Sequence, residues 1–446
     1  MLLELEVSNH RSIFEPVEFS MIAIDENRSA ARQFERFSKQ VLAVAGIYGP
    51  NASGKSNVLE AIAWLSSAVR TSLRAWDDGI PRDPHCFGFG PERPTTFELS
   101  LMAHEVRYEF RLEVDDQRVV YESLHSFPLR QRRKLFEREG DDIRFRRGFE
   151  GTGGIQDLLT PTTLALSAAT RLGSADAYAV GRSIGSIRLL GAHPSVRRRA
   201  PVPWHYPFTE SSLRLFQDEY EYPRLPGLAW EGDRPRPMEM LRIADPGIDS
   251  VEFDRGDDDE ESRRTKSRIR FVHRAETSPA VSDPESGPTG KQVSGHDQAT
   301  LEFEQESAGT QTWFRLIGPV LAALNEGRVV LYDEIDASLH PRLSAQLVRM
   351  FQDPRTNPHG AQLIFTTHDV SLLNSLNRDE VWLVDKRRDG STELFALAEF
   401  GGDRVRKSRN LERAYLQGRF GAVPNVDQRK IYRALGVNRE RSFEQV

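Results

Sequence analysis

The sequence contains a single cysteine, Cys86, among 446 residues. One thiol cannot form a disulfide within the chain, and it cannot supply the ligands of a cysteine-based zinc site. Disulfide-stabilised secreted folds and cysteine zinc modules are therefore excluded. We expect a protein of a reducing compartment, the cytoplasm.

Long apolar runs are also absent. Residues 1–7 alternate between apolar and acidic side chains, and they have neither the basic flank nor the apolar core of a signal peptide. No apolar stretch reaches the length that a helix needs to cross a bilayer. Both absences predict a soluble chain without a membrane partner. Hydrophobic residues make up 38% of the sequence, which is enough for packed cores.

The sequence has no excess of positive charge. Lys and Arg number 60 against 66 Asp and Glu, which gives a formal net charge of -6. Such a chain has no global attraction to nucleic acid, so nucleic-acid binding would require a local basic patch. Candidate patches lie at 130–134, 144–147 and 197–199 and in the tail after residue 403. The segment 129–147 interleaves arginine with phenylalanine and fits two structures, a surface that contacts a phosphate backbone or an edge hairpin protected by charge.

A phosphate-binding motif stands near the start of the chain. Residues 49–56 have the form G-x-x-x-x-G-K-S, between an apolar run of strand character and a helical pattern that opens at Ser56. The glycines let successive N–H groups point inward, and the following helix adds the positive end of its dipole. We expect Lys55 to reach the β- and γ-phosphates of a nucleotide and the Ser56 hydroxyl to bind Mg²⁺. The residues expected to form the nucleotide-binding loop are Gly49, Pro50, Asn51, Ala52, Ser53, Gly54, Lys55, Ser56 and Asn57.

Two acidic residues follow an apolar strand much later in the sequence. Asp333 and Glu334 come directly after the strand-like residues 329–332. A carboxylate at this position of a phosphate-loop enzyme holds Mg²⁺, directly or through water, and the next carboxylate can take a proton from the attacking water. We expect Asp333 to be the metal ligand and Glu334 to be the catalytic base.

A histidine ends a second apolar strand. His368 follows two threonines after the strand-like residues 363–365. In this position an imidazole can donate a hydrogen bond to a γ-phosphate and so sense its presence. A capping or core histidine is the alternative that the local sequence leaves open.

A second anion-binding turn precedes another helix. Ser307, Ala308 and Gly309 stand before an amphipathic pattern that runs through residues 314–324. A serine hydroxyl and free N–H groups at a helix start can bind an anion, although a capped helix without a ligand fits the same residues. Because the chain already has one phosphate loop, we expect this turn to close over a nucleotide held by a second copy. A symmetric dimer would then bury two nucleotides between its subunits.

The remaining patterns outline the fold. Alternating residues predict strands at 3–7 and 17–24, joined by a turn at 9–12. Arg11 would meet a nucleotide if this hairpin lies beside the phosphate loop, and a solvated turn arginine is the alternative. Residues 28–39 are polar, and we expect them to be irregular. Further strands are expected at 96–103, 106–114 and 119–127 as an antiparallel meander, and at 268–272, 300–304 and 394–398, with helical structure at 155–190 and in the tail.

The number of residues between the phosphate loop and the acidic pair differs among classes of phosphate-loop proteins. More than half of the sequence lies between Ser56 and Asp333. A small GTPase or a nucleotide kinase does not need so much chain there. A fold with a meander and a helical lobe inserted between these parts does.

Together these motifs resemble the ABC-type ATPase head of the SMC and RecF group. Within that group the chain is most similar to the stand-alone prokaryotic ATPases, AAA-family or RloA-like, of abortive-infection and anti-phage loci. The segments that carry the resemblance are residues 3–12 with their Asn-x-Arg-Ser turn, 49–57, 306–310, 333–341, 367–368 and 415–424.

The resemblance implies an α/β P-loop NTPase of the ABC-ATPase type. Its mixed central sheet would carry an antiparallel β meander, and a helical lobe would be inserted between the Walker A and Walker B motifs. The implied domains are an N-terminal ATPase lobe at 1–150, a helical or irregular insertion at 151–240, a C-terminal ATPase lobe at 241–402 with a mobile loop near 273–299, and a basic helical tail at 403–446.

The resemblance also implies a homodimer, or a higher even oligomer, that uses ATP and Mg²⁺. The usual Leu-Ser-Gly-Gly-Gln signature is replaced by Ser-Ala-Gly-Thr at 307–310, and the usual aspartate after the acidic pair is replaced by His340. From these departures we expect slow hydrolysis. The implied roles are catalysis for Lys55, Glu334 and His368, metal binding for Ser56 and Asp333, ATP binding for Arg11, and a signature acting in trans for Ser307, Gly309 and Thr310.

This motif set predicts a regulatory ATPase that controls a separately encoded effector, a nuclease, in anti-phage defence. The sequence itself holds no catalytic constellation for nucleic-acid cleavage. A RecF- or SMC-like ATPase of DNA repair or DNA binding is the alternative that the basic clusters favour. A third alternative is the ATPase subunit of a membrane transporter, and the opening at 9–11 and the divergent signature argue against it.

Overall fold

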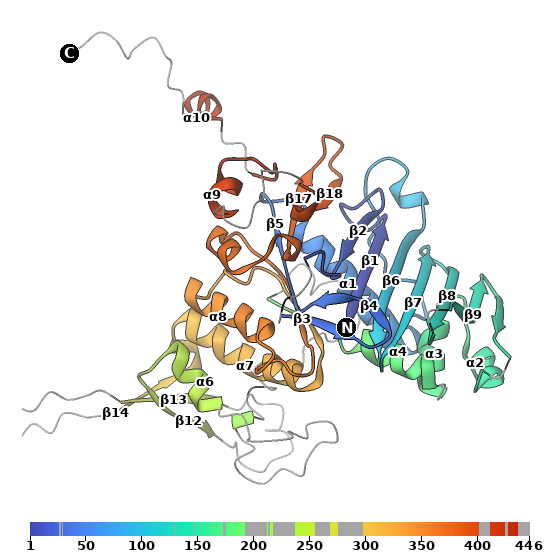
Figure 1. Ribbon diagram of the computed structural model, residues 1–446, viewed down its shortest axis with the longest axis horizontal. Helices are drawn as coiled ribbons and strands as arrows, with labels where there is room; N and C mark the ends of the chain where they lie inside the picture. Colours follow the sequence, from blue (N-terminus) through green and yellow to red (C-terminus); the bar gives the residue numbers. More distant parts are fainter. Residues whose placement is uncertain are drawn as a thin grey trace, which may run out of the picture.

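The structure of this protein is a computed structural model. No helix within the described residues is long and apolar enough to span a membrane. Figure 1 shows the strands β1, β2 and β6–β9 side by side on one side of the molecule, and the strands β12, β13 and β14 near α6 and α7. The described residues are 1–25, 28, 30–129, 131–147, 149–172, 175–191, 212, 215–216, 237–254, 268–274, 298–400, 411–423 and 427–435.

A six-stranded sheet carries the phosphate loop. Its order is β11-β15-β16-β5-β17-β18, and all neighbours are parallel except β17 and β18. The strands β5, β15 and β16 are buried along their whole length, as expected for apolar strands inside a parallel sheet. Because the carboxyl ends of parallel strands meet at one edge, the segments that follow these three strands lie together. The bounds are β5 (Val44–Tyr48), β11 (Arg188–Leu190), β15 (Val329–Tyr332), β16 (Gln362–Thr366), β17 (Val381–Lys386) and β18 (Thr392–Ala396).

The antiparallel meander expected from the sequence belongs to a seven-stranded sheet. Its order is β10-β9-β8-β7-β6-β1-β2. Leu5 in this sheet and Val58 and Ile62 on helix α1 (Lys55–Ala75) belong to one apolar core, so the helix after the phosphate loop is packed against the sheet. The bounds are β1 (Leu2–Ser8), β2 (Val17–Ser20), β6 (Thr95–Ala103), β7 (Val106–Val114), β8 (Val119–Phe127), β9 (Arg133–Glu139) and β10 (Asp142–Phe145).

A group of helices follows the meander in the sequence. They are α2 (Thr152–Leu158), α3 (Ala165–Leu172) and α4 (Ala175–Gly185), and α3 and α4 contact α1. The helical prediction for 155–190 is therefore right for most of this segment and wrong for its end. Arg188–Leu190 forms strand β11 because it pairs with β15 at the edge of the parallel sheet.

A second apolar core surrounds the small sheet β12-β13-β14. Phe271, Phe303 and Phe314 are buried and in ring contact, and Trp313 donates a hydrogen bond of 2.6 Å to the carbonyl of Met240. These contacts hold helix α7 against the small sheet and α6. The bounds are α6 (Pro237–Ala244), β12 (Ile248–Asp254), β13 (Arg268–Arg274), β14 (Gln298–Glu302), α7 (Ala308–Glu326) and α8 (Pro341–Gln352).

The prediction of irregular structure at 28–39 is wrong. The described part of this segment forms the hairpin of β3 (Ala31–Phe34) and β4 (Phe37–Leu42). Phe34 and Val41 are buried, but most of the residues around them in the sequence are polar. The sequence of the hairpin therefore shows no clear strand pattern. Strand β17 was not singled out by the sequence either. Short 3-10 helices occur at η1 (Gly90–Glu92), η4 (Phe303–Gln305), η5 (Val370–Ser375), η6 (Arg378–Glu380) and η7 (Leu397–Glu399).

The arginine-rich segment at 129–147 forms the edge hairpin of strands β9 and β10. Phe136 is fully buried and its ring contacts those of Phe145 and Phe149, so the aromatic residues face the protein. Lys134 pairs with Glu137 at 2.6 Å, and Arg144 pairs with Asp142 at 2.8 Å. The segment therefore forms an edge hairpin that carries charge, and its contact with a phosphate backbone stays a prediction.

Several expectations fall on residues outside the described ranges. These include most of the segment 197–237, the mobile loop expected near 273–299, the basic patch at 197–199 and much of the tail. Within the described part of the tail, α9 (Leu411–Leu416) and α10 (Gln428–Ala434) agree with the helical prediction.

Candidate functional site

The phosphate loop passes so close to neighbouring strands that two positions require glycine. A Cβ added at Gly49 would lie 2.3 Å from the carbonyl oxygen of Val384. A Cβ added at Gly54 would lie 2.1 Å from the hydroxyl of Thr392, and Gly54 has a left-handed backbone with φ 107°. These glycines are therefore fixed by steric contact as well as by backbone conformation.

Two hydroxyl side chains from distant segments brace the loop. Thr392 on β18 donates a hydrogen bond of 2.8 Å to the carbonyl of Ser53, and its hydroxyl lies 2.6 Å from that of Ser12. Asn57 donates to the same Ser12 hydroxyl. The Asn-x-Arg-Ser turn thus lies beside the phosphate loop, as expected. Sequence reasoning missed Thr392, because a threonine in a late strand carries no motif.

The buried lysine of the loop is held by its own backbone. Lys55 Nζ donates to the carbonyls of Gly49 at 2.9 Å and Pro50 at 3.1 Å. Burial lowers the pKa of Lys55, and the carboxylates of Asp333 and Glu334 act in the opposite direction. The hydroxyl of Ser53 is also buried, and it has no hydrogen-bond partner among the described residues. A glycine-lined loop with a lysine and an orphaned hydroxyl fits the phosphates of a nucleotide.

Asp333 joins the two halves of the predicted site. Ser56 Oγ donates to Asp333 Oδ1 at 2.9 Å, and Thr366 Oγ1 donates to the same oxygen at 2.6 Å. Asp333 is buried, and the hydroxyl oxygens of Ser56 and Thr366 lie beside its carboxylate. Oxygen atoms of these types are the ligands that Mg²⁺ prefers. The residues present therefore fit the ion. Thr366 was not predicted as a site residue, although it stands two residues before His368.

Glu334 is exposed beside this cluster. Its backbone N–H donates to Thr366 Oγ1 at 2.7 Å, and its backbone is left-handed with φ 55°. Such a conformation is uncommon for a residue with a long side chain, and it persists only where surrounding contacts impose it. Thr366 thus fixes both carboxylate residues at once.

The histidine at the end of β16 is fixed by an aspartate. Asp336 accepts a hydrogen bond of 2.7 Å from Thr367 Oγ1 and one of 3.2 Å from the backbone N–H of His368. Burial and then the charge of Lys55 lower the pKa of His368, so the imidazole is neutral at neutral pH. The role of His368 at a γ-phosphate stays a prediction, and Asp336 is a further residue to which the sequence patterns assigned no role.

Arg11 lies in the predicted turn, but its guanidinium is paired. It contacts the carboxylate of Glu60 on α1 and lies 3.1 Å from Asp83. Contact with a nucleotide would require these ion pairs to be exchanged, so its ATP-binding role stays a prediction.

The serine-glycine turn begins helix α7 as expected. Ser307 is exposed and caps the helix, accepting a hydrogen bond of 3.1 Å from the N–H of Thr310. Thr310 is buried, so its hydroxyl positions Ser307 at 2.8 Å. A Cβ added at Gly309 would lie 3.2 Å from the carbonyl of Ser338, so the turn packs on the loop after Asp333. Among the described residues, no hydrogen bond or ion pair joins 307–310 to the phosphate loop of the same chain.

His340, which replaces the usual aspartate, caps another helix. Its Nδ1 accepts a hydrogen bond of 3.2 Å from the N–H of Arg342 at the start of α8. The residue is exposed. It therefore has a local structural role in this chain.

The chain is similar to one family model and to solved structures. The model of the family described as "AAA domain, putative AbiEii toxin, Type IV TA system" matches residues 44–374. No curated protein matches the chain. The solved structure of an SMC head bound to the C-winged helix domain of ScpA is 15% identical, with 89% of this chain and 97% of that chain covered and a TM-score of 0.41. The SMC head domain from Thermotoga maritima is 14% identical, with 89% and 98% covered and a TM-score of 0.35.

Both TM-scores lie below 0.5, so the assignment rests on the family model, which spans more than half of the sequence. The chain belongs to this AAA-domain family, whose description names a putative AbiEii toxin.

Proposed function

We propose that this protein hydrolyses ATP, dimerises on ATP, and thereby controls a separately encoded effector, a nuclease, in anti-phage defence. The observation that carries the proposal is the hydrogen-bonded group of Ser56, Asp333 and Thr366, which connects the phosphate loop to the acidic strand end. A protein that only binds a nucleotide does not need a buried metal-ligating carboxylate followed by an exposed one at this edge.

Each residue of the cluster has a distinct part in this proposal. Lys55 and the N–H groups of the loop bind the phosphates, and Ser56 and Asp333 hold Mg²⁺, which supplies positive charge to the phosphates when bound. Glu334 accepts a proton from water, and its exposure beside the cluster gives it access to water. Neutral His368 donates a hydrogen bond to a terminal phosphate.

The dimer is inferred from the turn at the start of α7. Ser307 is exposed, and α7 is 19 residues long, so the positive end of a full helix dipole lies at this surface. In a twofold dimer the turn would lie against the nucleotide held by the other subunit. Thr310 and Gly309 support the turn from within, through the hydroxyl contact to Ser307 and the close approach to Ser338.

The effector is inferred from the family description. That description names a putative AbiEii toxin and a type IV toxin-antitoxin system. A system of two components supports a partner encoded by a separate gene. DNA binding by this chain itself has less support, because Lys134 and Arg144 of the β9–β10 hairpin already pair with Glu137 and Asp142.

The experiment compares wild-type protein with Glu334→Gln and a matched control, Glu105→Gln, at an exposed turn. We expect Glu334→Gln to bind ATP, to lose hydrolysis and to remain a dimer in light scattering, and Glu105→Gln to behave like wild type. Hydrolysis by Glu334→Gln at the wild-type rate would refute the assignment of the base.

The effector is tested by co-purification with the product of the adjacent gene, with and without ATP. An ATP-dependent complex and slower phage growth are the expected results. A solitary protein whose turnover is stimulated by DNA at low salt would instead favour a RecF-like role.

A further inference from the structure

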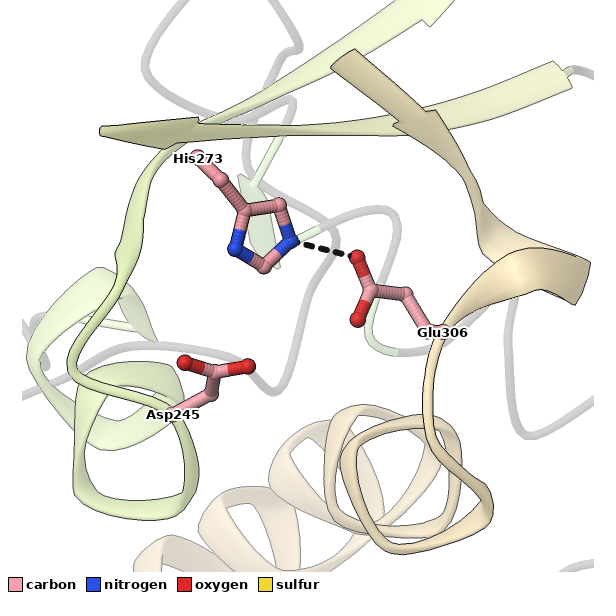
Figure 2. A group of neighbouring side chains, drawn as sticks. All are labelled: Asp245, His273 and Glu306. Carbon is pink, nitrogen blue, oxygen red and sulfur yellow. Dashed lines mark hydrogen bonds and ion pairs between the residues drawn. The ribbon is translucent and has the colours of Figure 1, made fainter. Parts of the chain in front are cut away.

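Three side chains with metal-ligating atoms converge next to the signature turn. Asp245 follows helix α6, His273 lies on strand β13, and Glu306 lies between η4 and Ser307. Figure 2 shows the two carboxylates and the imidazole directed toward a common space from these three segments. One ligand atom from each residue lies within 4.8 Å of the other two. His273 Nε2 and Glu306 Oε1 are 2.6 Å apart.

Within the described residues, no lysine or arginine side chain forms an ion pair with Asp245 or Glu306. The Glu306 side chain is only 4% exposed, and within the described residues its one ion-pair partner is His273. Asp245 accepts a hydrogen bond of 3.0 Å from the N–H of Gly247. The nearby Arg242 donates instead to the carbonyls of Ile248 and Asp249. Two carboxylates this close repel each other unless a cation lies between them.

A glycine keeps the space between the ligands open. A Cβ added at Gly247 would lie 3.2 Å from Asp245 Oδ1 and 3.6 Å from His273 Nδ1. A larger side chain at this position would enter the gap.

We propose that Asp245, His273 and Glu306 bind a divalent transition-metal cation, Zn²⁺ or Mn²⁺. One imidazole nitrogen with two carboxylate oxygens is a mixed ligand set that suits these ions better than Mg²⁺ or Ca²⁺, which take oxygen ligands. Ligand atoms around a Zn²⁺ at about 2.0–2.2 Å lie roughly 3–4 Å apart, so small side-chain rotations complete the site. Three protein ligands leave one position for water or another ligand.

The cation joins the small sheet to the turn that begins α7. Glu306 directly precedes Ser307, so a ligand bond to Glu306 fixes the backbone from which the exposed serine projects. His273 and Asp245 anchor the other side of the ion to β13 and to the end of α6. The site differs from the Mg²⁺ site at Asp333, with which it shares no residue.

The experiment measures metal binding by the full chain without nucleotide. Metal-free wild-type protein is titrated with Zn²⁺ and with Mn²⁺, alongside Asp245→Asn, Glu306→Gln and a matched control, His104→Gln, at an exposed turn. We expect wild type and the control to bind one more equivalent than Asp245→Asn and Glu306→Gln, or to bind it at least about tenfold more tightly. Equal stoichiometry and affinity in all four proteins would overturn the proposal.

A second measurement covers the case in which a variant does not fold. X-ray absorption of wild-type protein loaded with one equivalent of Zn²⁺ reports its ligands directly. Scattering from one imidazole with oxygen neighbours is expected. A spectrum without an imidazole contribution, or with several, would contradict the assignment. Because no nucleotide is present, neither outcome depends on the proposed ATPase function.

Discussion

Ser56 donates a hydrogen bond of 2.9 Å to Asp333, although 277 positions separate them in the sequence. Strand β16 lies between the strands that precede these residues, and Thr366 at its end donates to the same carboxylate oxygen. The parallel sheet therefore brings three segments of the chain to one point. The geometry of this point leads to the first two predictions.

Asp333→Asn keeps the shape of the side chain and removes its charge. We expect the affinity for ATP with Mg²⁺ to fall about tenfold or more, because the ion loses an anionic ligand. Affinity measured with a chelator present should change little, since Lys55 and the loop are intact. Titration of a fluorescent ATP analogue with and without Mg²⁺ checks this. An equal loss under both conditions would argue against metal binding by Asp333.

Thr366→Val removes the hydroxyl that positions both carboxylate residues. A buried acceptor on Asp333 and the N–H of Glu334 would each lose a partner, which costs about 1–3 kcal/mol of stability. We expect slower ATP hydrolysis together with this loss. Thr366→Ser is the matched control, because it retains the hydroxyl and should preserve turnover. Wild-type turnover in Thr366→Val would show that the hydroxyl is dispensable.

Gly54→Ala should prevent the phosphate loop from closing on its supports. The new methyl group would lie 2.1 Å from Thr392 Oγ1, in a left-handed backbone. We expect a loss of about 1–3 kcal/mol of stability and weak nucleotide binding, measured by denaturant unfolding and by titration. Gly153→Ala serves as the control, because a Cβ there would meet nothing within 4 Å. Equal behaviour of the two variants would contradict the steric account.

His10 gives a prediction about pH. It is buried, neither ring nitrogen has a hydrogen-bond partner among the described residues, and burial with the charge of Arg11 lowers its pKa from 6.5 to about 3. The unfolded chain therefore binds a proton that the folded chain does not between pH 6.5 and about 3. Stability from this residue is full above pH 6.5 and falls as the pH decreases, by at most about 1.4 kcal/mol per pH unit.

His10→Leu removes this titration without breaking a hydrogen bond. We expect its free energy of unfolding to fall less than that of wild type between pH 6.5 and 5, because leucine binds no proton in either state. Urea unfolding at a series of pH values measures the difference. Identical pH dependence in the two proteins would mean that the pKa of His10 is the same in the folded and unfolded states.

The residues of the candidate site that belong to a sequence motif could be predicted. The residues that only hold these motif residues in place could not. The glycine loop, the acidic pair and the histidine stand at strand ends, where chemistry and local pattern coincide. Thr392 and Asp336 belong to no motif. The fold places Thr392 against the phosphate loop and Asp336 beside the backbone of His368. The β3–β4 hairpin was missed because long-range packing buries Phe34 and Val41 within a polar sequence. The trans role of Ser307 stays a prediction.

The central claim is that the phosphate loop of one subunit and the serine-glycine turn of another form one nucleotide site. Lys55→Ala removes the first half, and Ser307→Arg blocks the second half without touching the loop. Each variant alone should fail to associate on ATP. A mixture of the two can form heterodimers that contain one intact composite site.

The most direct measurement is ATP hydrolysis and ATP-dependent association of that mixture. If the turn acts in trans, mixing should restore both, with hydrolysis at up to about half of the wild-type rate, because only heterodimers associate and each has one of its two sites intact. No gain on mixing, or full association by Ser307→Arg alone, would contradict the account.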